Sequence, residues 1–263
     1  MLYTLITGAS SELGRAFAVE CARRGQNLLL ADLPGSYART LCAPLRQQFG
    51  VDAQVVELDL TEMESVKETI DTLTEKYEIN FLINNAGLGG TASIVDSPAS
   101  LLDKIIQLNV RSSTLLTHML LPHLLQQKQS FILNVSSMAA FTPIAYKTVY
   151  PASKAFISSF SHGLRQELDN SPVSVSVLYP GPLMTNFDTS LRIMRMGHWG
   201  QWGLMSTKDV ASLAIRKTLR KKAVIIPGFF NRFCRALMRL IPLNLRLHLV
   251  SREVKKEIFF SNL

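Results

Sequence analysis

Short apolar runs alternate with longer helical patterns along most of this sequence. The strand-like runs are 3–7, 27–31, 53–58, 80–84, 130–136, 173–179 and 223–226. The helical patterns are 13–24, 36–49, 62–76, 98–126, 152–169 and 207–221. Several strand-like runs are apolar without alternation, which is typical of strands buried on both faces. This order predicts an α/β fold, with one doubly wound parallel sheet of about seven strands and helices on both faces.

The composition supports a packed domain of this kind. Of the 263 residues, 47% are hydrophobic and 18% are charged, which is enough apolar material for a sizeable core. The three cysteines, Cys21, Cys42 and Cys234, are too scattered for a disulfide framework or a zinc site. No apolar run approaches the ~18 residues of a spanning helix, and a strand pattern from residue 2 leaves no room for a signal peptide. We therefore expect a cytoplasmic protein that holds no metal.

The positive charge is concentrated near the C-terminal end. The formal net charge of the chain is +8. Residues 1–207 hold 15 Lys and Arg against 17 Asp and Glu, whereas residues 208–263 hold 13 against 3. The net charges of the two parts are therefore −2 and +10. A polyanionic partner would meet the C-terminal end.

Three helix starts carry capping signals. Residues 61–64 and 206–209 have the spacing of a capping box, the second with Asp in place of Glu. Ser97 precedes a proline, which predicts a capping hydroxyl followed by Pro98 at the first helical position.

Ligands of such sheets lie beyond the carboxyl ends of the strands, so the residues that follow each strand are candidates for a site. The first strand runs into a glycine-containing turn, residues 7–14. Its glycines allow a tight turn and a close approach of a phosphate to the N-terminus of the next helix. A plain strand-to-helix turn has the same pattern. The candidate cofactor contacts here are Gly8, Ser10, Ser11, Glu12, Leu13 and Gly14.

Acidic residues follow the second and third strands. Asp32 can accept both hydroxyls of an adenosine ribose and would repel a 2′-phosphate, or it can simply begin a turn. Asp59, followed by Leu60, can bond an adenine amino group. The alternative for Asp59 is a turn or cap residue before Thr61.

The fourth strand is followed by Asn84, Asn85, Ala86 and Gly87. The small residues Ala86 and Gly87 let the chain lie flat against a cofactor, and asparagines can bridge neighbouring strand backbones. Taken alone, the motif is more often a turn than a site.

The most informative residues are Ser137, Tyr150 and Lys154. Tyr150 and Lys154 are four positions apart and share one face of a helix. A lysine ammonium beside a phenol stabilises the phenolate and lowers the phenol pKa from roughly 10. A tyrosine that exchanges a proton near neutral pH needs such a shift. Ser137 follows the fifth strand, where its hydroxyl can bond the same substrate oxygen.

With these motifs the chain resembles the classical short-chain dehydrogenase/reductase family from residue 2 to about residue 228. The matching positions are the turn at 7–14, Asp59, 84–87, Asn109, Ser137, Tyr150, Lys154, Pro180, Gly181 and Thr185. The resemblance implies a single Rossmann-type domain that binds a nicotinamide dinucleotide. It also implies a homodimer or homotetramer formed through the long helices near 98–126 and 150–169.

The resemblance assigns a role to each matching residue. Tyr150 is the general acid for carbonyl reduction or the base for alcohol oxidation, and Lys154 lowers its pKa and holds the nicotinamide ribose. Ser137 orients and polarises the substrate oxygen. Asn109 holds a water that relays protons to Lys154. The segment from Pro180 through Gly181 to Thr185 borders the nicotinamide.

Glu12 departs from the family pattern, which has a glycine at this position. Its side chain can crowd the cofactor and add negative charge near the phosphates, or it can point to solvent at a helix N-terminus, where an acid is favourable. Glu12 and Asp32 together favour NAD(H), and NADP(H) stays open.

Two segments follow the shared motifs. Residues 184–207 correspond to the substrate lid of the family. They are rich in Met and Trp, which indicates a bulky apolar, lipid- or steroid-like substrate or ordinary packing under a loop. Residues 229–263 form a basic amphipathic extension beyond a catalytic domain of residues 1–228. This tail resembles that of uncharacterised bacterial reductases of the family. It can lie on an anionic membrane, or pack on the enzyme or a second subunit. No nucleic-acid motif accompanies its charge.

The sequence thus predicts an NAD(P)-dependent oxidoreductase that transfers a hydride to or from a carbonyl carbon. A catalytically silent dinucleotide-binding protein that acts through its basic tail is the alternative, because Glu12 weakens the cofactor motif. Ser137, Tyr150 and Lys154 argue against a silent protein. A methyltransferase with a similar first turn is a third interpretation, and it would not need the Tyr–Lys pair.

Overall fold

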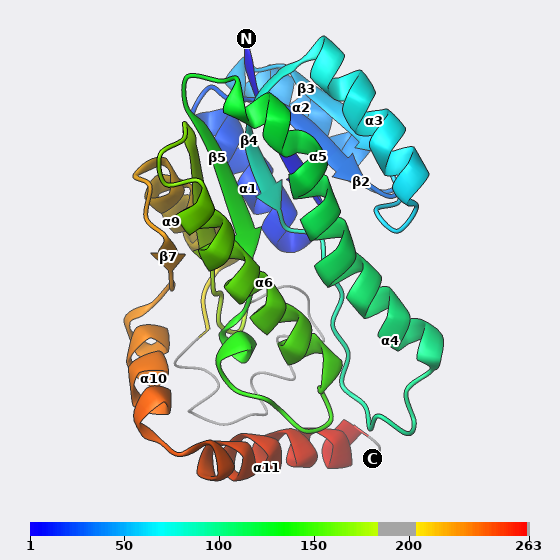
Figure 1. Cartoon of the computed structure of the whole chain (residues 1–263). Helices are drawn as coiled ribbons and strands as arrows, with labels where there is room; N and C mark the ends of the chain where they lie inside the picture. Colours follow the sequence, from blue (N-terminus) through cyan, green and yellow to red (C-terminus); the bar gives the residue numbers. More distant parts are fainter. Residues whose placement is uncertain (184–203, 262–263) are drawn as a thin grey trace.

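A parallel sheet of seven strands runs through the computed structural model, which describes residues 1–183 and 204–261 (Figure 1). The strand order is β3-β2-β1-β4-β5-β6-β7. The strands are β1 (Leu2–Thr7), β2 (Asn27–Asp32), β3 (Ala53–Glu57), β4 (Glu78–Asn84), β5 (Ser130–Val135), β6 (Val173–Leu178) and β7 (Val224–Ile225). The chain therefore reverses its direction of travel across the sheet between β1 and β4, which are hydrogen-bonded neighbours.

Helices cover both faces of this sheet. Their bounds are α1 (Glu12–Arg23), α2 (Ala38–Phe49), α3 (Met63–Lys76), α4 (Ala99–Ile106), α5 (Ser113–Leu125), α6 (Val149–Glu167) and α9 (Thr207–Leu219). One apolar core lies between the sheet and α1, α2 and α9, and the other lies between the sheet and α3, α5 and α6. The predicted doubly wound Rossmann-type fold is confirmed.

The predicted helix over 98–126 is interrupted. A π-helical segment, η1 (Gln107–Ser112), separates α4 from α5. It contains Asn109, which is buried and whose side chain bonds both backbone groups of Leu88. These bonds to a distant loop accompany the wider helical turn, a change that a sequence period does not reveal.

Of the three predicted caps, the structure confirms one. The Ser206 hydroxyl accepts a hydrogen bond from the Asp209 backbone at 3.1 Å. The Thr61 cap was wrong, because α3 begins at Met63 and Thr61 bonds Asp59 instead. The Ser97 cap was also wrong. Pro98 lies just outside α4, and the Ser97 hydroxyl donates to the backbone of the preceding turn.

Residues 229–261 fold into two helices that pack on the rest of the chain. They are α10 (Phe229–Leu240) and α11 (Leu243–Ser261). In Figure 1, α10 continues downward from β7, and α11 crosses below the loop that follows β5. Arg246 donates to the Phe141 carbonyl at 3.1 Å, and Ser251 accepts from the Ala145 backbone at 3.1 Å. No helix among the described residues is long and apolar enough to cross a membrane.

A buried chain of polar side chains links β4 and β5 to the helices above them. Asn84 donates to Thr117 at 2.9 Å and to Asn134 at 2.8 Å, and Asn134 donates to Ser161 at 2.9 Å. All four side chains are buried. Because these groups have no access to water, each bond that is removed leaves a costly unpaired polar atom.

We expect Asn134→Ala to lower the free energy of unfolding by about 2–4 kcal/mol, because it removes one buried hydrogen-bond partner each from the Asn84 amide and the Ser161 hydroxyl and leaves a cavity. Urea unfolding of the parent and the variant measures the loss. Asn170→Ala, an exposed site, is the control and should change the stability by less than about 0.5 kcal/mol. An equally small effect at Asn134 would contradict the role given to this polar chain.

Candidate active site

The turn between β1 and α1 requires both of its glycines. Gly8 has a φ of +64°, and a Cβ there would lie 2.9 Å from the Ala86 Cα. A Cβ at Gly14 would lie only 2.1 Å from the Gly8 carbonyl oxygen. Both contacts are too short for any side chain, so the ends of β1 and β4 and the start of α1 meet backbone to backbone.

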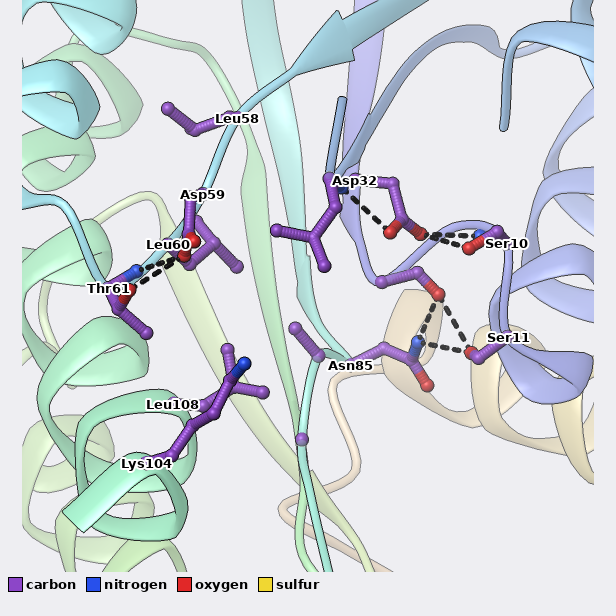
Figure 2. A pocket seen from close by; sticks show the side chains of 14 residues that line it. Ser10, Ser11, Asp32, Leu58, Asp59, Leu60, Thr61, Asn85, Lys104 and Leu108 are labelled. Atoms are coloured by element: carbon purple, nitrogen blue, oxygen red, sulfur yellow. Dashed lines mark hydrogen bonds between the residues drawn. The ribbon is translucent and has the colours of Figure 1, made fainter. Parts of the chain in front are cut away.

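Hydrogen bonds hold this turn in place (Figure 2). The Ser11 hydroxyl donates to the Gly8 carbonyl at 2.7 Å and accepts from the Gly14 backbone at 3.1 Å, so Ser11 caps α1. The Asn85 amide donates to the Thr7 and Gly8 carbonyls, both at 3.0 Å, and to the Ser11 hydroxyl at 3.1 Å. The expectation that an asparagine bridges neighbouring strands is confirmed. The turn is thus ordered by the protein's own hydrogen bonds, and the N-terminus of α1 follows it as a candidate anion site.

Thr7 is a supporting residue to which sequence reasoning gave no role. Its hydroxyl accepts from the Asn85 and Ala86 backbones, both at 3.0 Å, and donates to the Ile83 carbonyl at 3.3 Å. In the sequence, only the position of this hydroxyl at the end of a predicted strand could have indicated the supporting role of Thr7.

Asp32 lies at the end of β2 beside this turn. Its carboxylate accepts from the Ser10 backbone at 2.7 Å, from the Ser10 hydroxyl at 2.6 Å and from the Leu33 backbone at 2.8 Å. A carboxylate has about four acceptor positions, so Asp32 keeps capacity for a further donor. Asp32 also lines the cavity described next.

A cavity of about 290 Å³ opens at the carboxyl ends of β1 to β4 (Figure 2). It brings together most of the predicted cofactor contacts: Gly8, Ser10, Ser11, Asp32, Asp59, Leu60, Asn85, Ala86 and Gly87. Asp59 accepts from the backbone and hydroxyl of Thr61 at 2.9 and 2.8 Å, so its turn role is observed as well. The sequence gave no signal for Lys104 and Leu108, which line the opposite wall.

A second cavity of about 480 Å³ adjoins the first and shares Asn85 and Gly87 with it. It reaches Tyr150, Lys154 and Pro180, and it includes Leu13 but not Glu12. The two cavities together form a groove that leads from Asp32 to Tyr150.

Glu12 lines neither cavity. Its carboxylate forms an ion pair with Arg15 at 2.5 Å, one turn further along α1, and both side chains are about two-fifths exposed. The pairing and the exposure agree with the interpretation in which Glu12 points to solvent at the start of the helix.

Tyr150 and Lys154 lie on the first turns of α6, deep in the groove. The Lys154 ammonium donates to the Val135 carbonyl at 2.9 Å and lies 5.9 Å from the centre of the Tyr150 ring. Gly87 and Gly89 make room for them, because a Cβ at Gly87 would lie 3.2 Å from Lys154 Nζ and one at Gly89 3.5 Å from the Tyr150 ring.

Burial controls the protonation of both groups. It lowers the pKa of Lys154 to about 8 and raises the pKa of Tyr150 above its usual value. A hydrogen bond with Ser137 opposes part of the rise in the Tyr150 pKa. The pKa of Tyr150 is therefore raised overall, not lowered as the Tyr–Lys spacing had predicted, and stabilisation of the phenolate by Lys154 stays a prediction. The desolvation of the phenol outweighs its favourable contacts.

Asn109 lies next to this pair. Its side-chain oxygen accepts from the Leu88 backbone at 2.8 Å, and its amide donates to the Leu88 carbonyl and the Ser153 hydroxyl, both at 2.9 Å. A Cβ at Gly87 would touch both Asn109 and Lys154. The structure thus places Asn109 against the Lys154 region, and its role in a water relay stays a prediction.

A third cavity, of about 410 Å³, opens on the other side of Tyr150. Ser137, Tyr150, Pro180 and Gly181 form one wall. The tail forms the facing wall through Cys234, Arg235 and Met238 of α10 and Val250 of α11. Sequence reasoning gave these four residues no place in the site, because nothing in a local pattern shows which cavity a C-terminal helix will border.

The tail also packs closely against the segment that follows β6. Asn231 is buried and donates to the Pro227 carbonyl at 2.9 Å. A Cβ at Gly181 would lie 2.6 Å from the Asn231 amide, so the two segments are in close contact. The predicted contact residue Thr185 and most of the predicted lid, residues 184–203, lie outside the described residues.

Two helical glycines offer a matched comparison. Gly14→Ala should lower the free energy of unfolding by more than about 2 kcal/mol, because the new Cβ meets the Gly8 carbonyl. Gly163→Ala on α6 meets nothing within 4 Å and should raise it by up to about 1 kcal/mol. Urea unfolding of both variants checks this pair. Equal effects at the two sites would refute the crowding inferred at Gly14.

Replacing the buried ammonium should change the pH dependence of stability. The pKa of Lys154 falls from 10.5 to about 8 on folding, so the unfolded chain binds more protons between these pH values. The parent therefore gains stability as the pH rises through this window. Lys154→Met should be more stable than the parent at neutral pH, and its advantage should shrink by up to about 3 kcal/mol above pH 8. Urea unfolding across this range measures the difference, and an advantage that stays constant would contradict the burial cost.

A model of the short chain dehydrogenase family matches residues 3–195. Among curated proteins, the chain is 32% identical over 182 residues to a very-long-chain 3-oxoacyl-CoA reductase from Anas platyrhynchos. That match covers 68% of this chain and 58% of the relative, so the chain spans little more than half of that protein.

Two solved structures share the fold at 28% identity. A short-chain dehydrogenase from Sphingobium yanoikuyae in complex with NADPH has a TM-score of 0.76, with 92% of this chain and 97% of that one covered. The bulky-bulky ketone specific alcohol dehydrogenase from Comamonas testosteroni also has a TM-score of 0.76, with 92% and 95% covered. The family match covers most of the chain, and the site residues stand at the strand ends of the same fold. The chain therefore belongs to the short-chain dehydrogenase family.

Proposed function

We propose that this protein transfers a hydride between a nicotinamide dinucleotide and the carbonyl or secondary alcohol carbon of a bulky apolar substrate, with Tyr150 as the acid or base. One observation carries the proposal. Tyr150 and Pro180 line both the second cavity, at the end of the groove, and the third cavity, and of these two only Tyr150 carries a side-chain proton. A phenol at this junction can exchange a proton with a substrate in the third cavity while a nicotinamide occupies the second.

The groove fits a dinucleotide at several points. The close backbone approach at Gly8 and Gly14 leaves room for a pyrophosphate at the N-terminus of α1. Asp32 would accept the ribose hydroxyls and Asp59 an adenine amino group. Lys154 would hold the nicotinamide ribose, with Pro180 and the segment after it beside the ring. When bound, the nicotinamide supplies or accepts the hydride.

Tyr150 and Ser137 would handle the substrate oxygen. Because burial raises the pKa of Tyr150, the phenol is protonated at neutral pH, which is the form that carbonyl reduction needs. The Ser137 hydroxyl would polarise the same oxygen. The Lys154 ammonium would stabilise the phenolate that remains, and Asn109 would hold the water that returns a proton to Lys154.

The third cavity supports an apolar substrate. Most of its lining is apolar, including Met138, Phe141, Ile144, Met238 and Val250. The names of the relatives point the same way, since one acts on very-long-chain acyl compounds and another on bulky ketones. A silent dinucleotide-binding protein is less well supported, because Glu12 pairs with Arg15 outside both groove cavities.

The assembly is also a proposal. We infer a homodimer or homotetramer formed through α4, α5 and α6. Large apolar side chains on these helices stay exposed, with Ile106 48% and Phe156 44% accessible. Such surface is typical of an interface between subunits.

Tyr150→Phe tests the proposed chemistry. We expect it to lower kcat for ketone reduction by about 10²–10⁴-fold, because it removes the transferable proton, while NADH binding changes little. Tyr37→Phe, at a site 76% exposed, is the control and should keep full activity. A kcat within a few-fold of the parent would refute the role of Tyr150.

Asp32→Ala tests the preference for NAD(H). The parent should bind NADH more tightly than NADPH, and the variant should narrow that ratio about tenfold or more, because the carboxylate no longer repels a 2′-phosphate. Parallel nicotinamide fluorescence titrations measure both ratios, with exposed Asp96→Ala as the control. If the ratio of NADH to NADPH affinity is unchanged in the variant, or if the parent binds NADPH more tightly, the proposed preference for NAD(H) is wrong.

A further inference from the structure

The outer side of α10 and the turn after it present a row of large apolar side chains to solvent. Phe229, Phe233, Leu237 and Leu240 are 78%, 54%, 43% and 82% exposed, and their spacing of four, four and three places them on one side of the helix. Leu243 and Leu245 at the start of α11 are 48% and 52% exposed. We define the tail face as Phe229, Phe233, Leu237, Leu240, Leu243 and Leu245.

The opposite side of α10 is already packed against the enzyme. Asn231 is buried there, and Cys234, Arg235 and Met238 line the third cavity, with Arg235 stacked 4.9 Å from the Phe141 ring. The inward side therefore carries Asn231 and Arg235 beside Cys234 and Met238, while four large apolar side chains face outward. A helix that simply packs on a water-exposed domain has the reverse arrangement. An exposed apolar row of this length marks a contact surface.

Charge selects the partner. Residues 229–263 contain seven Lys and Arg against two Asp and Glu. Arg232 is exposed and stands one residue before Phe233, at the edge of the tail face. A second copy of the chain would bring the same positive charge against itself. A lipid surface with anionic headgroups offers negative charge above an apolar layer, which complements both features.

We propose that the tail face docks on the surface of an anionic lipid membrane, with α10 lying in the interface. Phe229, Phe233, Leu237 and Leu240 enter the boundary between headgroups and acyl chains, and Arg232 meets the headgroups. The contact lies on the membrane and does not cross it, because no described helix is long and apolar enough to span one.

Docking would place the third cavity close to the lipid. This inference about the substrate rests on the proposed function. The inner side of the same helix forms a wall of the third cavity, beside Ser137 and Tyr150. One helix, about 10 Å thick, then separates the lipid from the cavity. An apolar ketone dissolved in the membrane reaches the site without passing through bulk water.

Vesicle flotation with the full chain tests the docking. We expect binding to vesicles of phosphatidylcholine and phosphatidylglycerol in equal amounts, and little binding to phosphatidylcholine alone. Phe233→Ser with Leu237→Ser should weaken the binding about tenfold or more. Arg232→Gln should weaken it about fivefold, and salt should weaken it further.

Matched controls separate the tail face from general properties of the protein. Val19→Ser changes an apolar residue that is 44% exposed on α1, and Arg216→Gln removes an exposed charge from α9. Both should bind like the parent. Equal binding to neutral vesicles, equal loss in the controls, or no vesicle binding would overturn the proposal. So would an oligomer in sedimentation experiments that dissociates in the Phe233/Leu237 double variant without any vesicle binding.

Kinetics separate docking from the enzyme activity. The Phe233/Leu237 double variant should reduce a short water-soluble ketone at the parent rate and a long-chain ketone in anionic vesicles several-fold more slowly. Equal rates on the vesicle-borne ketone would overturn delivery from the membrane. If the parent reduces neither ketone, the proposed function is contradicted. The flotation result does not depend on that outcome.

Discussion

The close approach of the end of β4 to the turn after β1 determines where everything else in the site can lie. Gly8 and Ala86 touch backbone to backbone, and Thr7 and Asn85 cross-link the two strand ends with hydrogen bonds. This contact lies where the chain reverses across the sheet, between two strands with different crossover directions. The helices on either side therefore diverge, and the groove opens between them. The glycines that permit the contact also bring backbone N–H groups to the surface where a phosphate can bind them.

The other half of the site is built at a cost to stability. Lys154 is a buried cation that donates to one backbone carbonyl, and burial lowers its pKa because the charged form is disfavoured there. Tyr150 is likewise desolvated. Beside this pair, the polar chain through Asn84 and Asn134 links β4, β5 and α6 by buried hydrogen bonds. Buried groups with shifted pKa values of this kind cluster at active sites.

Local patterns predicted the strands, most helices and the strand-end residues, because burial on two faces and helical period leave clear marks in a sequence. They failed where a distant contact decides the outcome. The π segment at Asn109 accompanies bonds to Leu88, and Thr61 is drawn away from capping by Asp59. The pKa of Tyr150 depends on how deeply α6 packs, which spacing alone does not show. The wall formed by Cys234, Arg235 and Met238 depends on where the tail turns after β7, and no motif encodes that direction.

The position of β1 has a consequence for how the chain acquires its structure. β1 is made first, yet it is a central strand, and its second neighbour, β4, begins about 70 residues later. During synthesis one hydrogen-bonding edge of β1 has no partner until β4 has emerged, although α1, α2 and α3, which pack on its two faces, are made earlier. Pairing across such a separation must also overcome the entropy of closing a long loop, which makes folding slow compared with a protein of local contacts. The strand order that creates the groove therefore also makes the pairing of β1 with β4 a long-range step in folding.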